Sequence, residues 1–233
     1  MTTPDTTGAS TAEERGPSAP RGSRRLGAAG RLVEERIRGP RVRLQDRYVD
    51  DVPSGRADMA ALRAAAAKAP GQSPEIWHLT SVPGTDGAGD EPTREEWAVH
   101  TAMTLYAVHQ QSRTERMFQP GRGLGHAARQ LIGSPDDENP SARTRFNALV
   151  TSTTVAELRH HLRSLVSQLR SKSITLDYAM LADDLVLFQD PGRAKDVRLR
   201  WSRQYAFLPT DQDASDASTG SHSASPSAPT LEN

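Results

Sequence analysis

Residues 157–170, with the sequence ELRHHLRSLVSQLR, decide the fold because their apolar side chains recur at the spacing of an α-helix. On a helical wheel the apolar residues gather on one side, as in a helix that packs against a core; they are Leu158, Leu162, Leu165, Val166 and Leu169. Arg159, Arg163 and Arg170 point roughly 100° to 140° from Leu158, whereas the apolar residues centre near roughly 30°. The arginines therefore form a second stripe along one flank of the apolar one.

The other polar residues of this segment do not form a chemical centre. Glu157 lies at roughly 260° on the wheel, too far round to neutralise the arginines from within the helix. His160 and His161 are about 100° apart and are expected to face different surroundings. Glu157 and His160 have the Glu-x-x-His spacing of di-iron bundles, but the sequence holds no second copy of that pair. We therefore expect no metal site and no cofactor.

The sequence on both sides is rich in helix signals and nearly free of strand signals. TREE at residues 93–96 and TVAE at 154–157 are capping boxes that start helices. The segment after the first box, EEWAVHTAMTLYAVHQQ, is apolar over most of its circumference, which predicts a helix through the middle of a bundle. Asp190 followed by Pro191 indicates the start of the last helix. These signals predict an all-α fold, a single bundle of about eight to nine helices.

The bundle accounts for only part of the 233 residues. Residues 1–40 are rich in Thr, Ser, Pro, Gly and Ala, with seven Arg against five acids, and a short helix at RLVEERIRG is the one exception to their expected disorder. Residues 210–233 carry four acids and no Lys or Arg. The sequence thus predicts a disordered tail at 1–40, an all-helical domain at 41–209 and a disordered acidic tail at 210–233.

Several classes of protein are disfavoured. The chain has no cysteine, which excludes disulfides and thiolate metal sites. It has no apolar run long enough for a membrane and no signal-peptide core, so we expect a cytoplasmic protein without a membrane partner. PGRGLGH at residues 120–126 lacks the Lys-Ser or Lys-Thr ending of a nucleotide-binding loop; it is either a phosphate contact or a simple turn before a helix. With no nucleophile motif either, we expect no catalytic residues, no enzyme activity and no small-molecule substrate.

The charge distribution points to a polyanion. Although the formal net charge is zero, residues 113–172 carry ten Lys or Arg and only five Asp or Glu. Such a surplus on folded helices favours nucleic acid, with a solvated, salt-bridged surface as the alternative. Along the helix axis, Arg159 and Arg163 are about 6 Å apart, and Arg163 and Arg170 about 10 Å, which is comparable to the spacing of phosphates on a strand. One strand could therefore follow this face.

Several sequence blocks in order carry a family resemblance. TLYAVHQQS, then MFQPGRGLGHAARQL, then the segment from RFNALV to RQYAF resemble the CasB family, the small subunit of the type I-E CRISPR Cascade complex. The resemblance covers roughly residues 41–208 and is strongest from Tyr106 onward. It implies an all-helical, non-catalytic subunit, present in two copies, that contacts other Cascade subunits and stabilises opened target DNA while a guide RNA reads the sequence.

The basic residues expected to bind nucleic acid come from the stripe, its neighbours and this resemblance. Matches to the family's basic positions are Arg63, Arg129, Arg143, Arg145, Arg163, Arg170 and Arg203; the local pattern adds Arg122, Arg159, Lys172 and Arg200. The expected partners are guide RNA, target DNA, other Cascade subunits and a second copy of the chain. The main alternative is a helical scaffold whose arginines meet acidic proteins, and a helix-turn-helix regulator or a metal-dependent enzyme are more remote ones.

Overall fold

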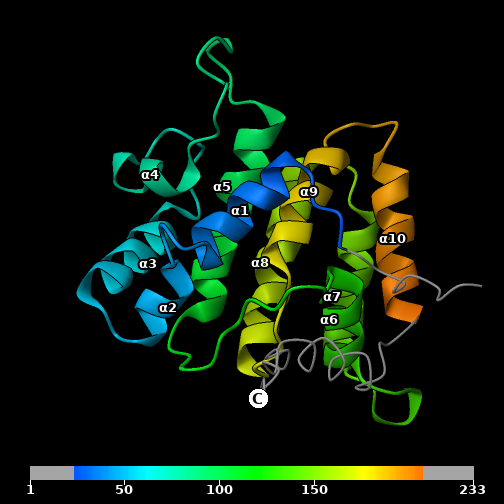
Figure 1. Cartoon of the computed structure of the whole chain (residues 1–233). Coiled ribbons are helices and arrows are strands. Elements are labelled where there is room, and N and C mark those ends of the chain that lie inside the picture. Colours follow the sequence, from blue (N-terminus) through cyan, green and yellow to red (C-terminus); the bar gives the residue numbers. More distant parts are fainter. Residues whose placement is uncertain (1–23, 207–233) are drawn as a thin grey trace, which may run out of the picture.

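The computed structural model describes residues 24–206. The tail predicted at 210–233 and the first 23 residues of the tail predicted at 1–40 lie outside the described residues. Within this range the predicted all-α fold is confirmed (Figure 1). The helices are α1 Ala28–Arg38, α2 Leu44–Val49, α3 Pro53–Ala65, α4 Trp77–Thr80, α5 Arg94–Gln110, α6 Leu124–Ile132, α7 Pro140–Thr151, α8 Val155–Ser171, α9 Tyr178–Phe188 and α10 Ala194–Ala206, with 3-10 turns at Pro74–Ile76 and Pro135–Asp137. The described part of the chain has no strand, only an isolated parallel bridge between Phe118 and Leu176.

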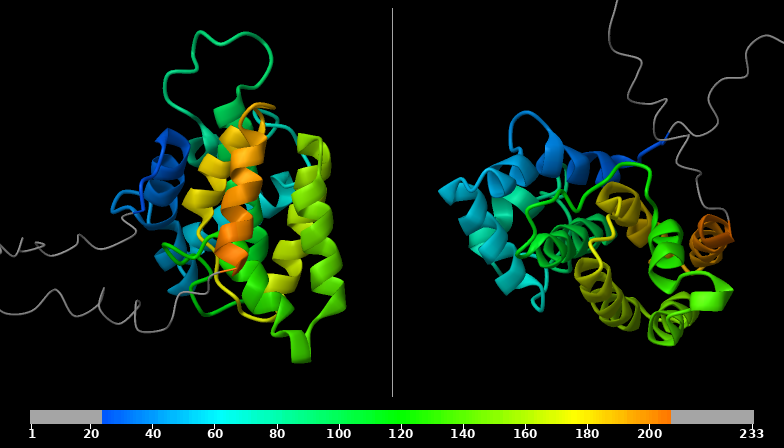
Figure 2. Two further views of the ribbon diagram at one scale, coloured as in Figure 1. Left: turned by 90° about the vertical axis from the view of Figure 1, so that its right-hand side faces the viewer. Right: turned by 90° about the horizontal axis from the view of Figure 1, so that it is seen from below.

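Helix α5 runs through the middle of the bundle, as its sequence predicts. It packs against α1, α3, α8 and α9, and Figure 2 shows it between the α1–α4 group and the helices that follow it. Its start is fixed by the predicted capping box: the Glu96 amide donates to Thr93 Oγ1 at 3.2 Å, and the Thr93 amide donates to the Glu96 carboxylate at 2.7 Å.

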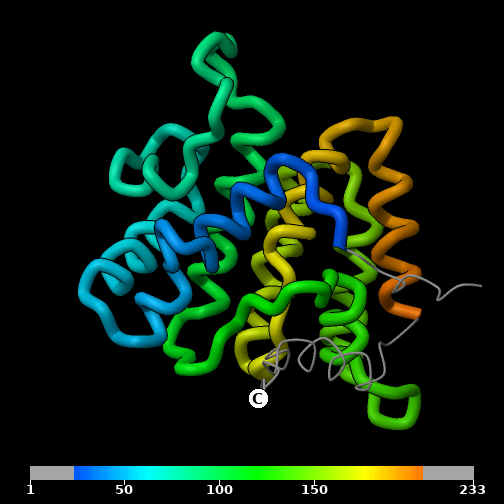
Figure 3. The backbone as a smooth tube through the Cα atoms, viewed as in Figure 1, coloured from blue at the N-terminus to red at the C-terminus, as the bar shows by residue number. Residues whose placement is uncertain are grey.

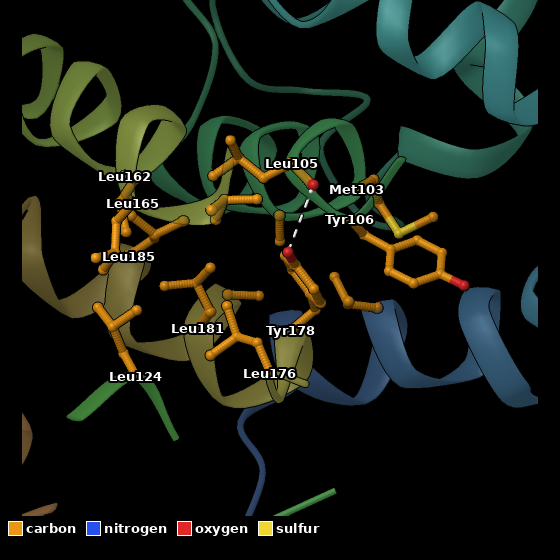
Figure 4. Packing of buried hydrophobic residues seen from close by; sticks show 14 of the residues in the cluster. Met103, Leu105, Tyr106, Leu124, Leu162, Leu165, Leu176, Tyr178, Leu181 and Leu185 are labelled. Carbon is orange, nitrogen blue, oxygen red and sulfur yellow. Dashed lines mark hydrogen bonds between the residues drawn. The ribbon is translucent and has the colours of Figure 1, made fainter. Parts of the chain in front are cut away.

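The core is continuous between α5, α8 and α9 (Figure 4). The Tyr106 and Tyr178 rings meet edge to face with their centroids 5.4 Å apart, and the Tyr178 hydroxyl donates to the Leu105 carbonyl at 3.4 Å. The apolar face predicted for α8 is fully buried, because the five side chains that form it, Leu158, Leu162, Leu165, Val166 and Leu169, are inaccessible to solvent. The periodicity of residues 157–170 thus places α8 correctly against the core.

The ordered domain begins earlier than residue 41, so the predicted boundary is wrong. The helix expected at RLVEERIRG is α1, which lies across α9 and α5 (Figure 3). Val33 and Ile37 of α1 are fully buried. The Asp183 carboxylate on α9 accepts hydrogen bonds from the Gly27 amide at 2.7 Å and the Gly30 amide at 2.8 Å. The composition of this segment resembles a disordered tail, but two buried apolar residues and two anchored glycine amides are enough to dock it.

Two local start signals are only partly correct. Helix α10 begins at Ala194 rather than directly after Asp190, whose carboxylate instead accepts from the Gly192 amide in a turn. At α8, Thr154 caps the Glu157 amide, but the Glu157 carboxylate accepts from the Thr153 amide. None of the described helices is long and apolar enough to cross a membrane.

Candidate nucleic-acid interface

The arginine stripe of α8 exists, and its first member is tied to α5. The Arg159 guanidinium lies 4.5 Å from the centre of the Trp97 ring and is half-buried there. Burial, and secondarily the Arg163 charge, lowers the pKa of Arg159. Beneath it His100 is buried without a partner for either ring nitrogen among the described residues, and burial followed by the Arg159 charge lowers the pKa of His100 to about 4. Arg159 therefore has a structural contact that the wheel did not show.

The other two stripe arginines each have one contact within the chain. Arg163 is exposed and donates through Nη2 to the Ala66 carbonyl just past α3. Arg170 donates through Nη1 to the Gln111 side chain at 2.9 Å. The stripe thus runs along the border of α8 with α3 and α5. Because one contact uses one or two of the five N–H groups of a guanidinium, these arginines keep donors for a phosphate.

Two predicted residues lie near the ends of this border. Arg63 is on α3, one turn before Ala66, and is half-buried, with Nη1 shielded from solvent and without a partner in the described range. Lys172 follows α8 and is exposed, and no contact of its ammonium group is present between residues 24 and 206. Lys172 is therefore a free surface charge, whereas Arg63 is partly withdrawn from solvent.

A second cluster joins α6, α7 and α10 around the Tyr205 ring. The Arg129 and Arg143 guanidinium groups lie 5.5 Å and 5.2 Å from its centre. Arg143 also makes two 2.9 Å hydrogen bonds to Glu138, and these bonds raise the pKa of Arg143 and lower that of Glu138. Arg129 donates to the Gly133 carbonyl at 2.9 Å. The two predicted arginines thus lie close together, but Arg143 is already paired with the Glu138 carboxylate.

The glycine-rich loop before α6 is a turn, and its structure disfavours the phosphate alternative. The Gly121 amide donates at 2.7 Å to the buried Asp177 carboxylate, so an anion of the protein already occupies this donor. Gly121 has a φ of 82°, a conformation that suits glycine. At Gly125 a Cβ atom would lie 2.1 Å from the Trp201 carbonyl oxygen, so α6 and α10 pack closely there. Arg122 donates to the Gln130 side chain on α6.

The two predicted arginines of α10 differ: Arg200 is paired with a buried carboxylate, and Arg203 is a free charge. Arg200 bonds to Asp184 of α9, which also accepts from Trp201 Nε1 at 2.6 Å. Burial raises the pKa of Asp184 to about 7, and the Arg200 charge opposes this shift. Arg203 is exposed, and its guanidinium makes no hydrogen bond or ion pair with a residue between 24 and 206. Arg200 therefore holds α10 to α9, and Arg203 is left available on the surface.

Arg145 lies on the other flank of α8 from the stripe. It is on α7, and its Nε donates to Ser164 Oγ of α8 at 2.7 Å. His160 and His161 line the same shallow depression. Their ring centroids are 5.3 Å apart in an edge-on contact, so the expectation that they face different surroundings is wrong. The wheel gives only the directions of their Cβ atoms, and both rings reach into the space beside α7.

No metal-binding geometry is found among residues 24–206. No three His, Asp or Glu side chains of the described range converge as metal ligands. Glu157 and His160 do not form a ligand pair, since Glu157 is bonded to the Thr153 amide and lies 3.9 Å from His161 instead.

Comparisons with known proteins place this helical arrangement in a family context. The family model for CRISPR-associated protein Cse2 matches residues 58–205. The crystal structure of CasB from Thermobifida fusca is similar over 78% of this chain and 100% of that one, with 35% sequence identity and a TM-score of 0.66.

Two more solved structures share the fold. A CRISPR-associated protein of the Cse2 family from Thermus thermophilus matches 78% of this chain and 99% of its own, with 24% identity and a TM-score of 0.54. A chain of a CRISPR RNA-guided surveillance complex matches 81% of this chain and 99% of its own, with 18% identity and a TM-score of 0.57. No curated protein sequence matches the chain.

Proposed function

Because this chain belongs to the Cse2, or CasB, family of CRISPR-associated proteins, we propose that it is a non-catalytic subunit of a Cascade complex whose arginine-bearing helices hold target DNA strands in the opened R-loop. The family match spans the chain from α3 to α10, so it includes every helix that carries a candidate basic residue. In such a complex the guide RNA reads sequence by base pairing, and protein surfaces hold backbones. The proposed partners are guide RNA, target DNA, other Cascade subunits and a second copy of this chain.

The observation that carries the proposal is the set of basic side chains with free donors on the outer surface. Arg163, Arg203 and Lys172 are exposed, and Arg170 uses only part of its guanidinium within the chain. Phosphate oxygens accept hydrogen bonds from such groups without regard to base sequence. A backbone-holding subunit needs this kind of surface, and it needs no base-reading helix.

Charge reversal of the stripe tests the proposal in the assembled complex. R163E/R170E is expected to weaken retention of target DNA at moderate salt, because two phosphate contacts become repulsive. R56E/R94E is the matched control: both arginines are exposed and paired with nearby aspartates outside the candidate set. Thermal melting of each variant checks folding. Unchanged retention by R163E/R170E contradicts the assignment of the stripe.

A second function has one observation in its favour. Arg143 and Arg200 already form ion pairs with carboxylates of this chain, so its basic residues can pair with acidic groups of a protein. A scaffold whose arginines meet acidic partner proteins would use them in the same way. Binding of the isolated full chain to DNA in a salt titration separates the two functions: a steep logarithmic slope supports nucleic acid, and no binding supports the scaffold.

A further inference from the structure

A shallow hollow opens between α7 and α8, on the flank of α8 away from the arginine stripe. It has a volume of about 520 Å³ and is open to solvent on one side. Helix α7 contributes Ser141, Thr144 and Arg145 to its lining. Helix α8 contributes the residues of the turn that follows its capped start, His160, His161 and Ser164.

Arg145 is held in a fixed position at this hollow. Its Nε donates to Ser164 Oγ at 2.7 Å, and its Nη1 donates to the hydroxyl and the carbonyl of Ser141. Both helices thus fix the plane of the guanidinium. Its Nη2 has no partner among residues 24–206, so one end of a rigid fork stays unused. A pre-positioned donor loses little entropy when it binds an anion.

The remaining polar groups of the hollow are also suited to donate. Ser141 and Ser164 accept from Arg145 and therefore keep their hydroxyl protons for an outside acceptor. The imidazole rings of His160 and His161 each carry a nitrogen that can donate an N–H. Within residues 24–206, no carboxylate lines the hollow. The nearest acid, Glu157, lies 3.9 Å from His161 and is bonded to the Thr153 amide.

A ligand for this hollow must accept hydrogen bonds, carry negative charge and fit an open, shallow surface. We propose that the hollow seats one backbone phosphate of a nucleic-acid strand, contacted by Arg145, His160 and His161. This inference rests on the proposed function and adds two histidines on the opposite flank from the stripe. Because the hollow is open to solvent, the strand can continue on both sides of the bound phosphate. A closed pocket would instead suit a small phosphate ligand.

Equilibrium binding of the full chain to a fluorescent single-stranded oligothymidylate tests the site. R145Q is expected to weaken binding about tenfold, because a charge-assisted contact is lost. H160Q/H161Q is expected to weaken it about threefold while keeping the α8 surface polar. R56Q is the control, since Arg56 is exposed, bonded to Asp51 and remote from the hollow, and it is expected to bind as the wild type does. If R145Q does not fold, the histidine pair, which lies at the surface, decides the question.

The source of the phosphate is resolved by following the histidine ring signals by NMR. The oligothymidylate should shift the His160 and His161 signals, and inorganic phosphate at the same concentration should not. Saturable shifts with inorganic phosphate and none with the oligonucleotide overturn the strand proposal in favour of a small phosphate ligand.

Failure of this site is distinguishable from failure of the proposed function. Wild-type affinity of both R145Q and H160Q/H161Q, together with a steep salt dependence of the wild type, overturns the hollow and leaves the proposed function standing. If the wild-type chain binds no oligonucleotide and R163E/R170E leaves DNA retention by the assembled complex unchanged, both the hollow site and the proposed function are wrong.

Discussion

Replacement of Asp184 by asparagine should change how stability depends on pH. The Asp184 carboxylate is buried, accepts from Trp201 Nε1 at 2.6 Å and pairs with Arg200, and burial raises its pKa from the ordinary 3.8 to about 7. The folded chain therefore holds a proton that the unfolded chain releases at lower pH. The stabilisation from this proton is fully present below pH 4 and is lost as the pH rises through 7.

The size of the effect follows from the shift. About two pH units separate pH 5 from the folded pKa, and each unit corresponds to about 1.4 kcal/mol, so Asp184 should contribute about 3 kcal/mol less to the free energy of unfolding at pH 8 than at pH 5. D184N has no titrating proton, its amide oxygen still accepts from Trp201, and the partly exposed Arg200 stays solvated.

Urea denaturation of the wild type and D184N at pH 5, 6, 7 and 8 measures this. The stability difference, wild type minus D184N, is expected to fall by about 3 kcal/mol across the series. D196N, which alters an exposed carboxylate of α10, controls for general charge effects and should show the same pH dependence as the wild type. A wild-type minus D184N difference that stays constant, or that grows with pH, refutes the reasoning.

Three further predictions concern stability at constant pH. G125A should destabilise the chain by about 2 kcal/mol or more, because its Cβ would collide with the Trp201 carbonyl oxygen, whereas G87A, which adds a Cβ in open space, should leave the melting temperature unchanged. T93A should cost about 1 kcal/mol in urea unfolding through loss of the α5 cap, and T93S should recover most of it. L165A should cost about 2–5 kcal/mol by opening a cavity under α8, and an L165A protein that unfolds at the wild-type urea concentration would contradict the core assignment.

The features that follow from short-range periodicity could be read from the sequence. The buried leucine face and the arginine flank of α8 depend only on 3.6-residue spacing, and the burial of α5 follows from apolar residues around most of its circumference. The Thr93 cap is equally local. In each case the neighbours that decide the structure lie within one helix, so no knowledge of tertiary contacts is needed.

Features that depend on contacts between distant residues could not be predicted. Nothing in the local sequence shows that the Gly121 amide would donate to the distant Asp177. That carboxylate occupies the place that a phosphate would take at the glycine loop. The same holds for Arg200, whose Asp184 partner is on another helix. The hollow beside α7 also escaped prediction, because a helical wheel fixes Cβ directions and leaves open where the His160 and His161 rings reach.

The docking of α1 on α9 has a consequence for how the chain acquires its structure. A ribosome makes α1 before the other described helices, but its binding surface on α9, including the Asp183 carboxylate that anchors Gly27 and Gly30, is synthesised only after α2 to α8. Until then the α9 part of the surface that α1 packs against is missing. Closing this long-range contact requires ordering most of the chain, which makes it slow compared with local helix pairing. The first of the described helices to leave the ribosome is thus among the last to reach its final packing.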